Sequence, residues 1–304
     1  MISTYKHNNI KWIDVYNPTK EEVLHLREEY KIPELAAEEM VQKTLRGKVD
    51  YYEKQGLVYL VLHFPTILQK GDKSHNEIEI DFIIGKDFLI TTHYEEIKSL
   101  KEFSKVFDTS TVLEKIDLGN HAGFLFFHIV RRLYKSSLDQ LQTIDTELEL
   151  IEEKIFENME EKMVRKISEL NRKLLDFKQA INVHGDILRS FENAGVKLFG
   201  EGFKYYLSDI MGDHRRVKTT LESHKDVLHD LKETNDALLT NKINSVMKAL
   251  TIMSFIMLPL TLITGVFGMN VQLNLTDVDF YRILGVMLVI AIVMFIYFKS
   301  KRWF

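Results

Sequence analysis

The sequence predicts an α+β membrane protein, in which an N-terminal α/β domain is followed by a long helical stalk and two C-terminal transmembrane helices. Strand and helix patterns alternate over residues 1–118, long helical patterns follow, and two uncharged apolar segments lie near the C-terminus. We therefore expect an α/β domain at 1–118, a stalk and intersubunit region at 119–246, and a transmembrane hairpin with a basic tail at 247–304.

The N-terminal domain is predicted from short strands and one capped helix. Ile10–Tyr16 alternates apolar and polar residues, which is typical of a strand. Thr19 and Glu22 form a capping box for a helix that runs through Glu29. Further strands are predicted at Leu57–Phe64, Ile78–Ile84 and Phe88–Thr92, the last two joined by a turn at Gly85–Asp87.

Long helices are predicted from about Asn120. Apolar residues three and four positions apart form a packing seam, and a second helix runs through Ile167 and Ile181. After a break at Gly195–Gly202, a third helix begins near Phe203 and continues into the first apolar segment. Its length would be roughly 60 residues, or about 90 Å at 1.5 Å per residue. A stalk that couples a soluble domain to a membrane segment needs such a helix.

The two apolar segments predict a membrane hairpin. Ala249–Phe267 and Ile283–Phe298 contain no charged residue, and a helix crosses a bilayer core with about 20 apolar residues. We expect the first span at about 248–268, an outer loop at 269–281 and the second span at about 282–299. The alternative, a hairpin buried in a soluble protein, is disfavoured because two such segments are joined by a short connection.

Positive charge predicts the orientation of the hairpin. The connection Val271–Phe280 contains no Lys or Arg, whereas Lys242, Lys248 and Lys299 flank the spans on the other side. By the positive-inside rule, both termini lie in the cytoplasm of a multi-pass cell-membrane protein. The N-terminus has no apolar signal core, and the absence of cysteine fits a reducing compartment.

Composition and motifs disfavour several functions. The formal net charge of -4 gives no sign of nucleic-acid binding. No Gly-rich phosphate loop is present, so we expect no organic cofactor. A membrane-anchored enzyme is a rival interpretation, but no His-Glu-x-x-His spacing or Ser/His/Asp arrangement occurs, and we expect no enzyme. The candidate histidines for such a role are His63, His93, His121 and His128.

A stripe of small and polar residues follows one face of the third long helix. Inside a membrane such a face suits either tight helix packing or a water-lined path. Asn244 and Asn270 bracket the stripe, which favours the path. Because one helix encloses nothing, a path requires several copies around an axis. The stripe consists of Asn244, Met247, Thr251, Ser254, Leu258, Thr261 and Gly265.

The motif that closes the first span resembles a known family. Gly268-Met269-Asn270, Pro259 within MLPLT, the two C-terminal spans, the short outer loop and the basic tail are similar to the CorA family of divalent-cation transporters. The resemblance covers nearly the whole chain. It implies a funnel-shaped homopentamer in the lipid bilayer that carries Mg²⁺, and often Co²⁺ or Ni²⁺.

The resemblance assigns roles by position. Asn270 would ring the outer entrance, with Gly268 and Met269 shaping the turn. Asp209 falls where the family places an acidic residue that binds regulatory metal between subunits, although Gly212 departs from a second acidic position. The conduit would be lined by Asn244, Met247, Leu250, Leu258, Thr261 and Gly265.

The expected cargo is a hydrated divalent ion. Mg²⁺ sheds water reluctantly, and neutral carboxamides can bind its waters without stripping them. The negative carboxylates of Asp277 and Asp279 either recruit ions at the mouth or belong to an ordinary solvated loop. A membrane potential of 100 mV supplies about 4.6 kcal/mol to a divalent ion. The alternative cargo on the same scaffold is Zn²⁺, against which Met269 argues.

Closure and regulation are expected at two places. Apolar rings at Met247, Leu250 and Leu258 can close the path by dewetting. The helix Leu138–Lys162 is strongly acidic and includes Asp139 and Asp145. Such a run is either a solvated face or a set of carboxylates that cytoplasmic Mg²⁺ bridges between subunits in the closed state.

Overall fold

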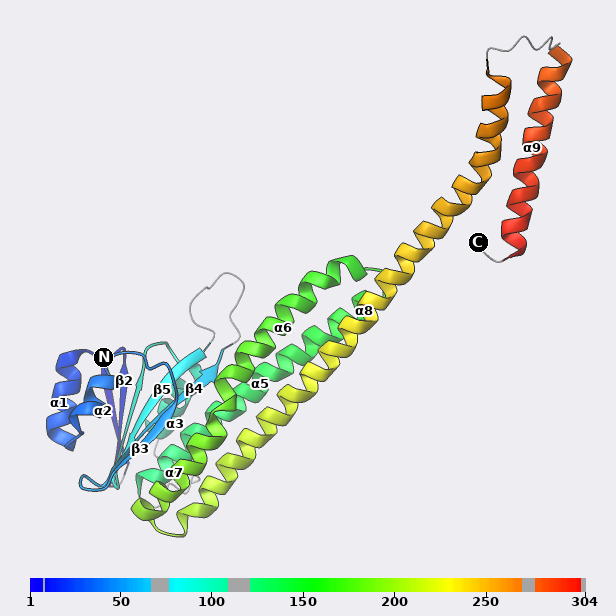
Figure 1. Ribbon diagram of the computed structural model, residues 1–304. Helices are drawn as coiled ribbons and strands as arrows, with labels where there is room; N and C mark the ends of the chain where they lie inside the picture. The colour runs from blue at the N-terminus through cyan, green and yellow to red at the C-terminus, as the bar shows by residue number, and fades with distance from the viewer. Residues whose placement is uncertain (8, 67–76, 109–120, 270–276, 302–304) are drawn as a thin grey trace. The chain divides into compact units, whose positions relative to one another are not determined.

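A computed structural model describes residues 1–7, 9–66, 77–108, 121–269 and 277–301 (Figure 1). Contacts divide the chain into two compact units. The first unit comprises Met1–Asn158 and Lys162–Leu231, and the second comprises Met159–Glu161 and Lys232–Phe304. The predicted division into three parts is not tested by these units and stays a prediction.

A six-stranded sheet organises the first unit, in the order β1-β2-β6-β5-β4-β3. Neighbouring strands are antiparallel except β2 and β6, which are parallel. All nine residues of β4 are buried because both faces of the sheet are covered. The strands are β1 (Ile2–His7), β2 (Ile10–Tyr16), β3 (Lys48–Tyr52), β4 (Leu57–Pro65), β5 (Glu77–Ile84) and β6 (Phe88–His93).

The predicted strands are confirmed, with ends that differ by one residue at most. The turn between β5 and β6 is closed by the Gly85 amide, which donates to the carbonyl oxygen of Phe88 over 2.9 Å. Strands β1 and β3 were not predicted. Each lies at an edge of the sheet, and their residues are mostly half-buried, so the hydrophobic pattern is weak there.

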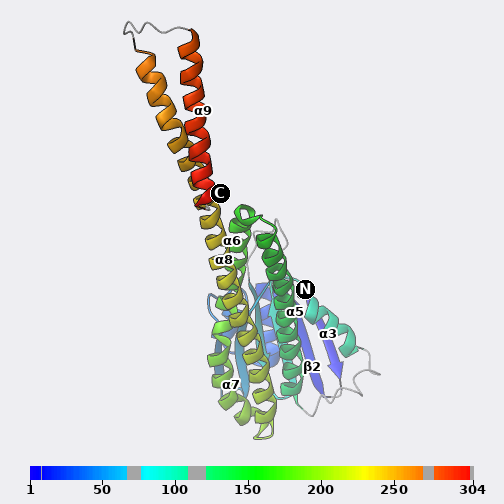
Figure 2. The same ribbon diagram turned by 90° about the vertical axis from the view of Figure 1, so that its right-hand side faces the viewer.

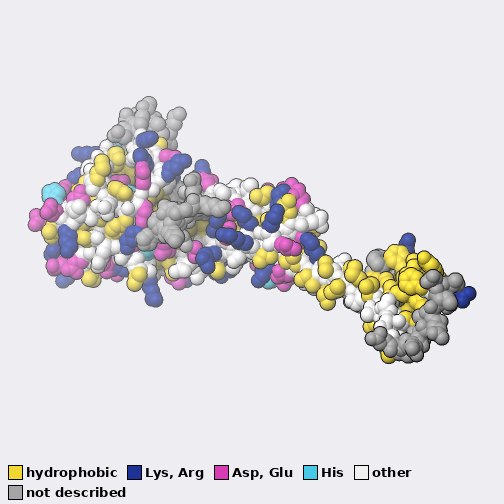
Figure 3. Space-filling model, turned by 90° about the horizontal axis from the view of Figure 1, so that it is seen from above, with side chains coloured by type: hydrophobic (Ala, Val, Ile, Leu, Met, Phe, Trp, Pro, Cys, Tyr) yellow, Lys and Arg dark blue, Asp and Glu magenta, His cyan; other side chains and the backbone are white. Residues whose placement is uncertain are grey.

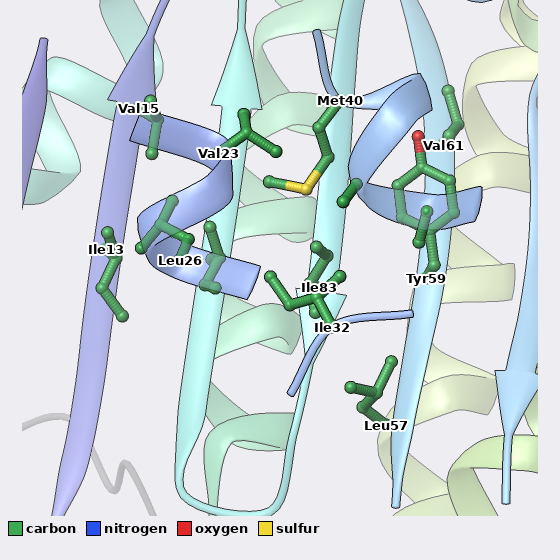
Figure 4. Close-up of a cluster of buried hydrophobic side chains, with 13 residues drawn as sticks. Ile13, Val15, Val23, Leu26, Ile32, Met40, Leu57, Tyr59, Val61 and Ile83 are labelled. Carbon is green, nitrogen blue, oxygen red and sulfur yellow. The ribbon is translucent and has the colours of Figure 1, made fainter. Parts of the chain in front are cut away.

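Helices α1 (Lys20–Tyr30) and α2 (Glu34–Glu39) lie against one face of the sheet. The capping box of α1 is confirmed, because the Thr19 hydroxyl accepts from the Glu22 amide and the Glu22 carboxylate accepts from the Thr19 amide. Figure 4 shows the apolar core between these helices and the sheet. Its labelled members are Ile13, Val15, Val23, Leu26, Ile32, Met40, Leu57, Tyr59, Val61 and Ile83.

Helices cover the opposite face of the sheet (Figure 2). They include α3 (Lys98–Asp108), α5 (Ala122–Phe156) and α7 (His184–Phe199), beside which α6 (Glu160–Asn182) runs. A buried polar chain ties these layers together. His184 Nε2 donates to the carbonyl oxygen of His63 over 2.9 Å, and Tyr134 donates to His184 Nδ1 over 2.9 Å. Burial lowers the pKa of His184 to about 3, so the ring is neutral.

The second unit contains the membrane end of α8 and all of α9 (Asp277–Ser300). Helix α8 (Phe203–Phe267) starts where the sequence predicted and runs for 65 residues through Pro259. Helix α9 begins before the predicted second span, so Asp277 and Asp279 lie in its first turn and not in an outer loop that reaches 281. Acidic residues favour a helix N-terminus. The start of the second span was predicted from apolar residues alone, so this signal was missed.

Candidate functional site

Two helices of the second unit are long and apolar enough to cross a membrane. The candidate spans lie in α8 and at Phe280–Ser300, and only 6% of each apolar window is buried within the chain. A core helix of a soluble protein would be mostly buried. Figure 3 shows hydrophobic side chains gathered over the hairpin. Within the hairpin, the Phe255 and Phe298 rings pack with centroids 6.2 Å apart.

Most side chains of the predicted stripe on α8 are exposed in a single chain. Leu258 is 67% exposed and Met247 is 54% exposed. Thr251 is half-buried. The remaining stripe residues are also exposed, as is Leu250 beside them; they are Asn244, Ser254, Thr261 and Gly265. The chain therefore presents these residues together on one helix but does not enclose a path with them.

The hydroxyl groups of the stripe bond to their own helix. Thr251 donates to the Met247 carbonyl oxygen over 2.8 Å, and Ser254 donates to the Leu250 carbonyl oxygen over 2.9 Å. Thr261 makes the equivalent bond to a carbonyl oxygen one turn earlier, over 2.8 Å. Each hydroxyl proton is thereby satisfied, which makes these polar groups compatible with an apolar surrounding, while lone pairs of the oxygens remain available as acceptors.

A groove of about 690 Å³ follows the stripe on α8. Five residues of the predicted site line it: Ser254, Leu258, Thr261, Gly265 and Met269. Sequence reasoning missed the other lining residues, Met257, Leu262 and Val266. Each lies next to a stripe residue in the chain, so widening the stripe by one position on either side would have found them.

The glycines of this segment differ in what surrounds them. A Cβ added to Gly268 would lie 2.8 Å from the carbonyl oxygen of Thr264, the same oxygen that accepts from the Gly268 amide at the end of α8. A larger residue would therefore displace the backbone there. A Cβ added to Gly265 would meet nothing within 4 Å in this chain. The third motif residue, Asn270, lies outside the described residues, and Met269 is 60% exposed.

The predicted regulatory carboxylates are not gathered by one chain. Asp209 is half-buried on α8, and Asp139 is exposed on α5. Asp145 Oδ1 lies 3.4 Å from Nε2 of His224. Within the described part of the chain, no group of three or more His, Cys, Asp or Glu residues could hold a metal ion. The side chains of Asp277 and Asp279 are not among those described.

The histidines considered for an enzyme have structural partners where they are described. His63 Nε2 lies 3.1 Å from the Thr44 carbonyl oxygen and 3.5 Å from Glu79 Oε2. His93 contacts Asp14, and His121 stacks between the rings of Phe124 and Phe199.

These features define a class of membrane protein, with a mixed α/β unit, a very long helix and a C-terminal apolar hairpin. The family model described as CorA-like Mg²⁺ transporter protein matches residues 7–302. The chain therefore belongs to the CorA-like family of Mg²⁺ transporters, as the motif at the end of α8 predicted.

Individual relatives match over nearly their full length. YfjQ of Bacillus subtilis is 28% identical over 297 residues, covering 96% of this chain and 89% of the relative. The cobalt/magnesium transport protein CorA of Thermotoga maritima is 27% identical, with 96% and 83% covered. The complete structure of the CorA magnesium transporter from Methanocaldococcus jannaschii superposes with a TM-score of 0.83 at 21% identity, covering 99% of this chain and 93% of that one. That structure shares the fold predicted here, from the α/β domain to the two C-terminal apolar helices.

Proposed function

We propose that this protein is a Mg²⁺ uptake channel that also admits Co²⁺ and Ni²⁺. Membership of the CorA-like family makes it a divalent-cation transporter of membranes. The Thermotoga maritima relative is named a cobalt/magnesium transport protein, which supports these ions as cargo. Hydrated ions would move inward down the membrane potential, with both termini in the cytoplasm.

The observation that carries this proposal is the open polar stripe of α8. Four of its residues, Ser254, Leu258, Thr261 and Gly265, line a groove on a helix that is long and apolar enough to span a membrane, yet one chain leaves them exposed. The proposed assembly is a homopentamer in which five copies of α8 surround the path. Gly265 supports it, since its missing side chain has no steric reason within the chain and would leave room at the axis.

The proposed path has a selective mouth and an apolar gate. A ring of Asn270 carboxamides would bind the waters of the ion, held in place by the backbone turn that Gly268 permits. The hydroxyl oxygens of Thr251, Ser254 and Thr261 would accept hydrogen bonds from those waters. Met247, Leu250 and Leu258 would form the rings that close by dewetting.

Cytoplasmic Mg²⁺ would regulate the channel at subunit interfaces. Asp209 on α8, with Asp139 and Asp145 on α5, would supply carboxylates to such sites. The absence of a metal cluster among the described residues of one chain fits sites that need two copies. At the other end of the path, Asp277 and Asp279 would raise the local cation concentration through their negative potential.

The deciding experiment is Mg²⁺ flux into liposomes that hold the purified protein under an inside-negative potential. We expect Mg²⁺ flux in wild type and a loss of that flux, by about 100-fold, in Asn270→Ala. The substitution removes the ring of carboxamides that would bind the waters of the ion at the mouth. Asn274→Ala removes a carboxamide from the same connection and serves as the matched control. Zn²⁺ movement without Mg²⁺ movement would establish Zn²⁺ as the cargo, and no flux of any divalent ion would contradict the channel.

A further inference from the structure

The tip of the hairpin formed by α5 and α6 belongs to the second unit, whereas the rest of that hairpin belongs to the first. Met159–Glu161 belongs to the second unit, while the helices on either side belong to the first. The chain therefore passes between the units at three points, after residues 158, 161 and 231. Two of these connections flank the tip, so the tip is joined through the chain to the first unit on both sides.

One ion pair holds this tip to α8 within the second unit. Glu160 is 5% exposed, and its Oε2 lies 3.5 Å from Nζ of Lys242. The Lys242 side chain is 49% exposed, so the cation reaches from a wet surface to a buried carboxylate. A buried carboxylate is costly without a partner, and removing one member of such a pair is strongly unfavourable. The contact between Glu160 and Lys242 therefore depends on the opposite charges of the two side chains.

The position of the pair relates it to the proposed path. Lys242 lies two residues before Asn244 and five before Met247, the first residues of the stripe. Residues 240–250 of α8 are all exposed, so Lys242 is a point at which this segment is held by the chain itself. Formation or loss of the ion pair between Glu160 and Lys242 would therefore affect the position of the first stripe residues, Asn244 and Met247.

The same side of α8 contains an unpaired polar group. Asn235 lies seven residues, or two helical turns, before Lys242 and is 1% exposed. Its Oδ1 has no hydrogen-bond partner among the described residues. Burying an unpaired oxygen costs free energy, which water would return if this side of α8 opened.

We propose that Glu160 and Lys242 form a latch that positions the cytoplasmic start of the path and transmits regulation to it. Neither residue contacts the ion in this scheme; both act by holding α8 near Asn244. The proposal rests on the channel function proposed above. It adds a specific pair of positioning residues to that function, one of them, Glu160, within the acidic segment Leu138–Lys162.

The test separates a mechanical tie from a local charge effect. Glu160→Gln and Lys242→Met break the same bond but change the local charge in opposite senses. A latch predicts that both shift the cytoplasmic Mg²⁺ concentration that half-inhibits flux, in the same direction and by at least about threefold. An effect of charge on the passing ions predicts shifts in opposite directions and would overturn the proposal. The reversal Glu160→Lys with Lys242→Glu should restore the wild-type value.

A second readout does not depend on flux. The chain contains no cysteine, so Met159→Cys provides one thiol at the tip. In that background we expect Glu160→Gln and Lys242→Met each to raise the rate of maleimide labelling by at least about threefold, since a loosened tip is more accessible. Unchanged labelling overturns the latch even if wild type conducts. Absence of wild-type flux together with faster labelling in both variants would contradict the channel and leave the latch standing.

The control is a neighbouring pair that the latch does not include. Lys154 Nζ lies 2.6 Å from Glu157 Oε2 on the exposed end of α5. Glu157→Gln should leave both the half-inhibiting concentration and the labelling rate at their wild-type values, because an exposed pair contributes little. Equal effects of Glu157→Gln and Glu160→Gln would show that any loss of acidic charge suffices, and would overturn the assignment to Glu160.

Discussion

The sheet of the first unit and the hairpin of the second are both rich in apolar residues, but they bury them differently. Every residue of β4 is buried, and Trp12 and Phe82 are fully enclosed. In the hairpin, only 6% of each apolar window is buried. The sheet finds its apolar partners within the chain, whereas the apolar side chains of the hairpin are mostly left without partners in the described part of the chain. Hydrophobicity alone does not distinguish these two situations.

The two regions also satisfy polar groups differently. In the sheet, buried polar side chains reach across strands and loops: Trp12 Nε1 donates to Thr91 over 3.0 Å, and the Thr44 amide donates to Glu79 over 2.9 Å. In the hairpin, hydroxyls such as that of Ser254 bond to the backbone one turn earlier. The first arrangement depends on tertiary contacts, and the second survives in an isolated helix.

The largest contrast is expected from a matched truncation. Leu60→Ala removes a fully buried side chain from β4 and should destabilise the first unit by about 2–5 kcal/mol, through lost burial and a cavity. Leu288→Ala, at a residue 63% exposed in α9, should cost less than about 1 kcal/mol in detergent. Urea unfolding followed by fluorescence of the buried Trp12 measures the first unit. Equal costs would show that the hairpin is buried by contacts the single chain lacks.

A second pair tests the hairpin alone. Gly268→Ala brings a Cβ against the Thr264 carbonyl oxygen and should lower thermal stability in detergent by about 1–3 kcal/mol. Gly265→Ala meets no atom of its own chain and should be neutral or stabilising by up to about 1 kcal/mol, because Ala favours helices. It should nevertheless lower Mg²⁺ flux by narrowing the path. Destabilisation by Gly265→Ala would place another copy against that residue.

The smallest expected effect is a pH dependence of the first unit. Burial lowers the pKa of His93, but Asp14, whose carboxylate lies 3.3 Å from Nε2, and the Glu95 carbonyl oxygen outweigh it, so the pKa is raised. The folded protein thus holds this proton more tightly than the unfolded chain. The resulting stability is complete below about pH 6.5 and is lost as pH rises through the raised pKa.

Asp14→Asn isolates that contribution. Removing the carboxylate should lower the pKa of His93 in the folded protein. The urea midpoint of the variant should therefore fall less than that of wild type as pH rises from about 6 to 9. His63 and Asp81, whose pKa values are also raised, act in the same direction, so the informative quantity is the difference between wild type and variant. Parallel pH profiles would mean that Asp14 does not hold the proton on His93.

Much of the fold could be predicted from particular residues. The alternation at Ile10–Tyr16, the capping box at Thr19 and the turn at Gly85 are local signals, and each is where the structure has it. The edge strands β1 and β3 could not be found, because their residues are half-buried and alternate weakly. The start of α9 was placed late because its first turn contains Asp277 and Asp279, which no search for apolar residues includes.

The sequence by itself determined the family and the face of α8 that carries the proposed path. The family follows from the motif Gly268-Met269-Asn270, and the face follows from the stripe between Asn244 and Gly265, because residues three and four apart share a helix face wherever the helix lies. Only the tertiary structure decided the partners of buried groups. Glu160 and Lys242 are 82 residues apart in the chain, and His63 and His184 are 121 apart. Such pairs are set by how helices and strands pack, and no local pattern encodes that.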